Sequence, residues 1–147
     1  RLIEHGLPGI MIAHVRYPQV DSEVASLSPY WLRTALRGDL GFGGVIFSDD
    51  LSMRALVSEG DMAERTRRTL AAGADMALIC NDPASADATL AALRGYSDPV
   101  GQVVSQARLI TLRRRPVSEA GFRGSLPWRQ AVAALDQAQA PPGLVLR

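Results

Sequence analysis

Three short, continuous apolar runs constrain the fold of this chain more than any other feature. They cover residues 9–15, 45–48 and 75–80, with the sequences GIMIAHV, VIFS and DMALIC. Apolar runs of this length, without polar alternation, are typical of strands that are buried on both faces of a parallel sheet. We therefore expect three buried strands at these positions.

Helical signals separate the three runs. The residue types and spacing predict helices over residues 28–38, 61–73, 82–93 and 100–113. Ser28 is the expected N-cap of the first helix, Asp61 opens a capping box for the second, and Asp82 caps the third. Strands that alternate with helices in this way indicate an α/β fold built from consecutive βα units.

Three parallel strands cannot close a barrel, and they leave two open edges. The chain is therefore expected to be part of a larger sheet or barrel, or a small open sheet that needs a partner. The signal weakens beyond about residue 116, where residues 118–121 resemble a loop and 127–139 a helix that ends at residues 141–143.

Two adjacent acids, Asp49 and Asp50, follow the second run directly. Ionised carboxylates are costly to bury, so a pair at a strand's end requires water, a cation or a ligand beside it. In parallel α/β folds this carboxyl edge is where ligands bind and catalytic residues collect. The alternative is that one acid only caps the next helix. Strand periodicity puts the two side chains on opposite faces but does not say which one faces a ligand.

Composition excludes several classes of function. The chain has 147 residues, 47% of them hydrophobic, a net charge of +1 and no lysine. Without lysine there is no P-loop and no Schiff-base enzyme, and the arginines are too dispersed among acids to predict nucleic-acid binding. The apolar runs are too short to span a membrane, and no secretion signal is visible, which predicts a cytoplasmic protein. No cofactor or metal site is expected, because the single cysteine provides no metal-binding frame.

Three further side chains have an expected place. Met11 and Met53 are expected to pack in the core rather than contact a ligand. Cys80, at the end of the third run, is expected to be a small core residue.

Four segments in order resemble bacterial glycoside hydrolase family 3 β-N-acetylglucosaminidases, the β-hexosaminidases of peptidoglycan recycling. These segments are GIMIAHVRYP at 9–18, ASLSPYWLR at 25–33, LRGDLGFGGVIFSDDLSM at 36–53 and AAGADM at 71–76. The resemblance covers roughly the first two thirds of the chain. It implies the C-terminal part of a TIM-like (β/α)8 barrel over residues 1–115, with about three βα units. Residues 116–147 contribute nothing specific to the resemblance and are expected to form a C-terminal helical tail.

The resemblance also implies a reaction. Its Ser-Asp-Asp-Leu motif makes Asp49 the nucleophile of a retaining hydrolase that removes terminal β-linked N-acetylglucosamine from peptidoglycan-derived muropeptides through a covalent glycosyl-Asp intermediate. His14 would lie in the pocket wall and contact the substrate. The family's acid/base His and Asp and its Lys-His-Phe-Pro-Gly-His-Gly motif have no counterpart here. The isolated chain is therefore expected to be inactive and to need the N-terminal half of the barrel.

Two other functions fit the residues less well. A phosphoacceptor receiver domain also has adjacent acids at a strand end, but it needs a strand-end lysine, which this chain lacks. A non-catalytic α/β interaction module, such as a degenerate half barrel, is the other alternative.

Overall fold

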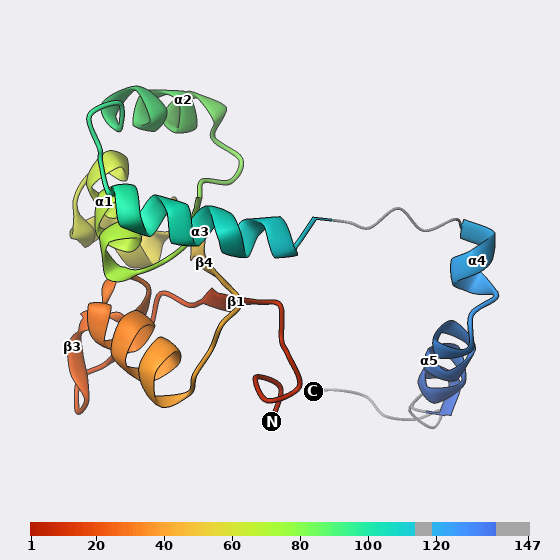
Figure 1. Cartoon of the computed structure of the whole chain (residues 1–147). Helices are drawn as coiled ribbons and strands as arrows, with labels where there is room; N and C mark the ends of the chain where they lie inside the picture. The colour runs from red at the N-terminus through yellow and green to blue at the C-terminus, as the bar shows by residue number, and fades with distance from the viewer. Residues whose placement is uncertain (114–118, 138–147) are drawn as a thin grey trace, which may run out of the picture. The chain divides into compact units, whose positions relative to one another are not determined.

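A computed structural model describes residues 1–113 and 119–137 of the chain (Figure 1). The chain divides into two compact units, Arg1–Arg113 and Arg114–Arg147. All the sites expected from the sequence lie in the first unit. No helix in the described residues is long and apolar enough to cross a membrane.

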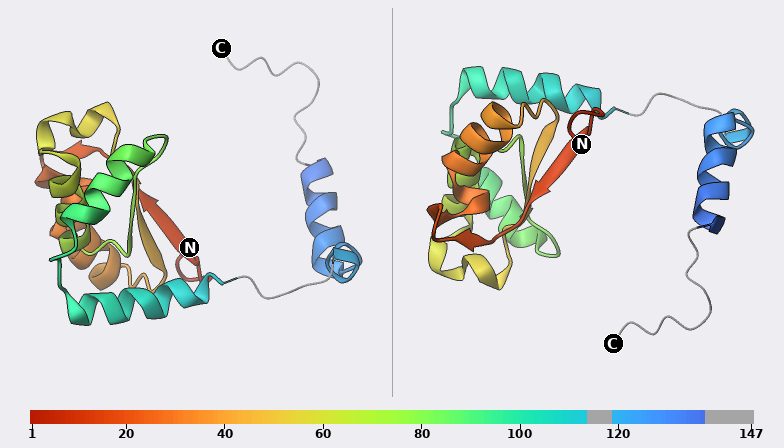
Figure 2. Two further views of the ribbon diagram at one scale, coloured as in Figure 1. Left: turned by 90° about the horizontal axis from the view of Figure 1, so that it is seen from above. Right: turned by 90° about the horizontal axis from the view of Figure 1, so that it is seen from below.

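The first unit is built on a three-stranded parallel sheet of order β1-β4-β5. Its strands are β1 (Gly9–Ile12), β4 (Val45–Asp50) and β5 (Met76–Leu78). Gly9 pairs with Val45, and Phe47 pairs with Met76. Figure 2 shows β1 and β4 side by side in this sheet. The predicted α/β fold with a parallel sheet is confirmed, although β1 and β5 are shorter than their apolar runs and β4 is longer because it includes both acids.

A small antiparallel hairpin follows β1. It consists of β2 (Arg16–Tyr17) and β3 (Asp21–Val24), and the sequence analysis did not predict it. Both strands are short and mostly exposed, so they lack the apolar pattern from which strands are recognised.

Helices connect the strands. In chain order they are η1 (Ala25–Leu27), η2 (Tyr30–Asp39), η3 (Arg54–Glu59), α1 (Met62–Ala72), α2 (Pro83–Ala92) and α3 (Pro99–Thr111). η2 has π-type hydrogen bonding, with Leu40 N donating to the Ala35 carbonyl, whereas η1 and η3 are 3-10 helices.

The caps form as their residue types predict. Asp61 accepts from Glu64 N at 2.7 Å, and Asp82 accepts from Ser85 N at 3.0 Å. Ser28 Oγ accepts from the backbone N–H of the third residue after it at 3.2 Å. These three bonds satisfy N–H groups that a helix start leaves unpaired.

Two apolar clusters hold the sheet to its helices. One consists of Leu32, Leu36, Phe42, Ile46, Ala72 and Ala74, and the other of Val24, Leu27, Leu51 and Leu56. Ile46 and Leu51 are fully buried, and each such side chain contributes roughly 1.5–3 kcal/mol by its burial. Because Ile46 lies three residues before Asp49 and Leu51 directly follows Asp50, packing holds the segment that carries the acid pair on both sides.

Three expected core residues lie elsewhere. Met11 is 54% exposed, Met53 is 43% exposed, and Cys80 is exposed beyond the end of β5. The core prediction was wrong for all three. Met11 and Cys80 lie on or just after the edge strands β1 and β5, whose apolar runs are not covered on every side, whereas Met53 lies in the exposed turn between β4 and η3.

A buried carboxylate ties the start of β5 to the helices. Asp75 accepts from Arg37 and from Ile46 N through one oxygen, at 2.6 and 2.8 Å. Its other oxygen accepts from Ser105 Oγ at 2.7 Å and from Arg108 at 3.0 Å. This charged cluster lies at the N-terminal end of β5, the end opposite the acid pair.

The second unit contains α4 (Glu119–Arg123) and α5 (Leu126–Gln137). The rings of Phe122 and Trp128 lie 4.9 Å apart and join the two helices. The prediction of a loop over 118–121 was wrong for residues 119–121, which are helical. Residue 118 lies outside the described residues. The helix expected over 127–139 is confirmed as far as 137, and its last residues and the expected end at 141–143 also lie outside them.

Candidate active site

The carboxyl ends of β1, β4 and β5 meet at one edge of the sheet. Asp49 and Asp50 are the last two residues of β4, and His14 follows β1 at the same edge. The structure therefore brings together the two residues that the sequence singles out, Asp49 and His14. They are linked through Asp50, whose carbonyl oxygen accepts from His14 Nε2 at 2.9 Å.

Asp50 is bound into the fold. Its Oδ1 accepts from Ser52 N and from Cys80 N, each at 3.0 Å, and its Oδ2 accepts from Ser52 Oγ at 2.7 Å. Burial alone would raise the pKa of Asp50, but the hydrogen bonds from Ser52 and Cys80 outweigh it and hold the pKa below its ordinary value. Asp50 is thus an ionised carboxylate whose Oδ1 joins the end of β4 to the residue Cys80 after β5, while both of its oxygens hold Ser52 in the turn after β4.

Asp49 differs from its neighbour. Within the described residues its carboxylate makes one hydrogen bond, in which Oδ1 accepts from Asp50 N at 2.8 Å. Its second oxygen has no partner in that part of the chain, and the side chain is only partly buried. Asp49 therefore keeps a carboxylate oxygen open to a ligand while its backbone is held inside a strand.

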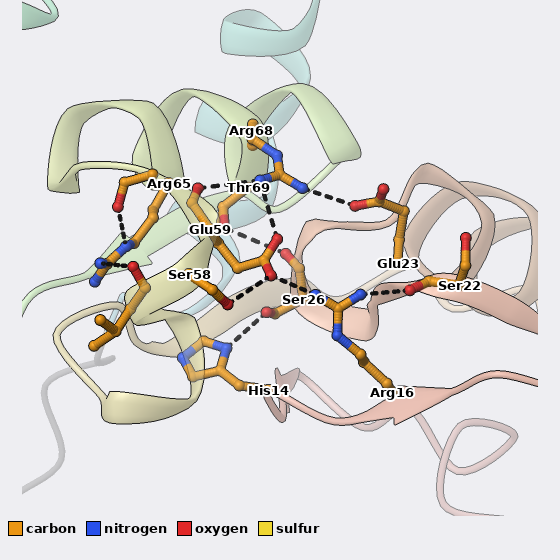
Figure 3. Close-up of polar contacts among 12 residues, drawn as sticks. His14, Arg16, Ser22, Glu23, Ser26, Ser58, Glu59, Arg65, Arg68 and Thr69 are labelled. Atoms are coloured by element: carbon orange, nitrogen blue, oxygen red, sulfur yellow. Dashed lines mark hydrogen bonds and ion pairs between the residues drawn. The ribbon is translucent and has the colours of Figure 1, made fainter.

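Both nitrogens of His14 are engaged, and Figure 3 shows the contact with Ser26. Nε2 lies 2.9 Å from the Asp50 carbonyl, which can only accept, so Nε2 carries the proton. Nδ1 then accepts from Ser26 Oγ at 2.6 Å. The ring connects the end of β1, the helix η1 and the end of β4, and what it still offers to a ligand is its carbon edge.

Two hollows in the first unit have volumes of about 700 and 300 Å³. The larger lies beside Asp75 and α3, and the smaller is an apolar groove that includes Met11 and Trp31. Neither of these two hollows is lined by Asp49 or His14.

The described residues contain no group of three or more His, Cys, Asp or Glu side chains that could hold a metal ion. The chemistry that the arrangement offers is that of an accessible carboxylate at the end of a rigid strand. Such a group can act as a nucleophile, as a base or as a hydrogen-bond acceptor.

Comparison with known proteins identifies the family. The glycosyl hydrolase family 3 N-terminal domain matches residues 1–111. The chain belongs to this family. Its family 3 relatives include a beta-hexosaminidase from Pseudomonas aeruginosa, 46% identical over 133 residues, which cover 90% of this chain and 39% of that protein. A beta-hexosaminidase from Nitrosomonas eutropha is 51% identical over 94 residues, which cover 64% of this chain and 27% of the relative.

Solved structures agree with this assignment. NagZ from Neisseria gonorrhoeae in complex with N-trifluoroacetyl-D-glucosamine is 34% identical, with a TM-score of 0.68 over 92% of this chain and 38% of that one. A family 3 beta-N-acetylglucosaminidase from Paenibacillus is 27% identical, with a TM-score of 0.64 over 92% of this chain. The chain thus spans about two fifths of the length of the Pseudomonas relative. The matched family model is described as the family's N-terminal domain. This description does not match the expectation that the chain is the C-terminal half of the barrel.

Sequence reasoning missed two residues at this edge. Ser26 is 1% exposed and holds His14, and Arg65 is 9% exposed and contacts the segment after the acids. Nothing in their local sequence marks either one, because a serine before a helix and an arginine in a helix are ordinarily surface residues.

Proposed function

We propose that the chain is part of a retaining β-N-acetylhexosaminidase and that Asp49 is its nucleophile. The observation that carries the proposal is the division of roles within the acid pair. Asp50 uses both carboxylate oxygens to hold the strand end, whereas Asp49 leaves one oxygen open. A retaining glycosidase needs such an open, rigidly held carboxylate next to the anomeric carbon.

In the proposed reaction the open oxygen of Asp49 attacks the anomeric carbon of the sugar. A glycosyl-ester bond forms while the glycosidic C–O bond breaks, and the leaving oxygen takes a proton from an acid. Water then attacks the same carbon, gives a proton back to the group that acted as the acid, and releases Asp49 as a carboxylate as the glycosyl-ester bond breaks. The general acid is assigned to a part of the enzyme outside this chain, because the family's acid/base motif has no counterpart in the sequence.

The proposed substrate is terminal β-linked N-acetylglucosamine in peptidoglycan-derived muropeptides, hydrolysed in the cytoplasm without a cofactor or metal. Support comes from relatives named beta-hexosaminidase and from a neighbour solved with N-trifluoroacetyl-D-glucosamine. His14 is proposed as a pocket residue. Because both of its nitrogens are engaged, it would touch the sugar through its ring carbons while its hydrogen bonds hold Asp50.

We also propose that residues 1–115 form the C-terminal part of the family's barrel and that 116–147 form a helical tail. Three parallel strands with open edges and the two-fifths share of the Pseudomonas relative support a partial barrel, and the C-terminal placement rests on the motifs at 9–18 and 36–53 that resemble the family. The remaining barrel strands would cover these edges and complete the pocket in front of Asp49.

The test is made in a complete barrel that contains this segment. A 5-fluoro glycosyl inactivator should label Asp49, and Asp49→Asn should lose nearly all release of p-nitrophenol from the β-N-acetylglucosaminide. Asp50→Asn is the matched control, because it makes the same chemical change one residue away. It should retain measurable turnover with reduced stability. A label on Asp50, or near-normal activity of Asp49→Asn, would overturn the assignment.

A further inference from the structure

Arg65 is a buried cation that is held by backbone carbonyls. It lies on α1 and is 9% exposed. Its Nε donates to Gly60 O at 2.8 Å, one terminal nitrogen donates to Leu51 O at 3.0 Å, and the other donates to Val57 O at 3.4 Å. Among the described residues, none of the ion pairs involves Arg65. Burying an arginine without a carboxylate is costly. The Arg65 contacts therefore hold backbone carbonyls in place rather than pair its charge with an acid.

The three carbonyls belong to one segment, residues 51–60, which joins β4 to α1. Leu51 is the first residue after Asp50. Its side chain is fully buried, and its N–H donates to Leu78 O at 2.9 Å while its carbonyl accepts from Arg65. The residue immediately after the acid pair is thus fixed through its N–H, its carbonyl and its side chain.

The far end of the same segment is also held. Glu59 pairs with Arg16 of the hairpin and with Arg68 of α1, and Arg68 also donates to the Glu59 carbonyl at 3.1 Å. Arg68 continues to Glu23 on β3 at 2.7 Å. Figure 3 shows these contacts, with Arg65 and Arg68 both descending from α1 towards the segment. The Glu59 network is more exposed to solvent than the Arg65 contacts, since Arg16 and Glu23 are 46% and 48% exposed.

We propose that Arg65 is a positioning residue for the nucleophile. This inference rests on the proposed function of Asp49. The guanidinium spans three carbonyls with its planar set of donors, and in doing so it sets where the chain leaves β4 and where the Asp49 carboxylate lies. A lysine ammonium carries its charge at one point and cannot span the same three acceptors. A displacement of about 1 Å at a reacting group can lower the rate by about a hundredfold.

The experiment compares Arg65→Lys with Arg67→Lys in the complete barrel. Arg67 lies on the same helix and is exposed, so its variant controls for the chemical change. Activity on the p-nitrophenyl β-N-acetylglucosaminide is expressed per active site, counted with the fluoro glycosyl inactivator. Arg65→Lys should lower kcat per site by about tenfold or more with a smaller change in KM, and Arg67→Lys should stay within about twofold. Added guanidinium should restore part of the activity of Arg65→Ala.

A merely structural role would give a different result. It would reduce the number of titratable sites or the melting temperature while leaving kcat per site unchanged, and that outcome would overturn the proposal. Failure of Arg65→Lys to fold would also overturn it, because the proposal requires a folded variant with a displaced segment.

A second readout does not depend on activity. Trypsin cleavage after Arg54, followed by mass spectrometry, reports on the segment in this chain, where Arg54 is exposed within η3. Arg65→Lys should accelerate this cleavage and Arg67→Lys should not, since both retain a trypsin site. If cleavage is faster but the unmutated complete barrel is inactive, the proposed function is rejected, and what remains is that Arg65 holds the segment 51–60. Unchanged cleavage would show that Arg65 does not hold the segment and would reject the positioning role itself.

Discussion

His14 should stabilise the fold as well as line the site, and its replacement by alanine measures how much. His14→Ala removes the hydrogen bonds to Ser26 Oγ and Asp50 O. It also leaves the Ser26 hydroxyl, which is 1% exposed, with no other partner in the described residues. One lost hydrogen bond costs about 0.5–1.5 kcal/mol and one buried unsatisfied group about 1–3 kcal/mol. The free energy of unfolding should therefore fall by about 2–4 kcal/mol.

Urea denaturation of four proteins tests this value: the wild-type chain, His14→Ala, Ser26→Ala and the double variant. Because the double variant removes both partners, it should cost less than the sum of the two single changes by about 1 kcal/mol. His5→Ala is the control, since His5 is exposed and should change the stability by less than about 0.5 kcal/mol. A His14→Ala chain as stable as the wild type, or strictly additive effects, would refute the structural role and leave only the proposed pocket contact.

Two further changes probe the frame around the site. Asp75→Asn should lower the free energy of unfolding by about 3–5 kcal/mol, because it breaks a buried ion-pair cluster. Asp98→Asn is the control and should be nearly neutral, because asparagine caps a helix as well as aspartate does. Thermal and urea unfolding measure both changes. Gly44→Ala should cost about 1–3 kcal/mol, because the new Cβ would lie 2.6 Å from Pro8 O, while Gly43→Ala meets nothing within 4 Å; equal stability of these two variants would contradict the packing argument.

The sequence was sufficient for features that local signals encode. Apolar runs located β4, and the capping residues Asp61 and Asp82 located the starts of α1 and α2, because each signal lies within a few residues of its effect. The β2–β3 hairpin could not be found in this way. Its strands are short and polar, and their pairing depends on contacts that leave no periodic pattern.

The candidate site follows the same rule, and the roles of its residues remain predictions. The acid pair at a strand end is a local pattern, but periodicity did not distinguish Asp49 from Asp50. The difference between them depends on the hydrogen bonds that Asp50 accepts from Ser52 and from Cys80 N, the latter 30 residues away along the chain. Arg65 was missed because it is buried by contacts with residues 51–60, a segment that precedes its own helix. Long-range contacts of this kind are specified by the whole fold.

The position of β4 in the middle of the sheet also affects how the chain reaches its native state. Both neighbours of β4 are distant in sequence: Gly9 pairs with Val45, and Phe47 pairs with Met76. The paired residues are 36 and 29 positions apart (45 − 9 and 76 − 47), and the entropy of each loop closure is lost before any contact compensates for it. Asp49 acquires its final surroundings only after both closures. Until then β4 presents an unpaired backbone edge to other chains, so productive folding competes with aggregation and depends on protein concentration.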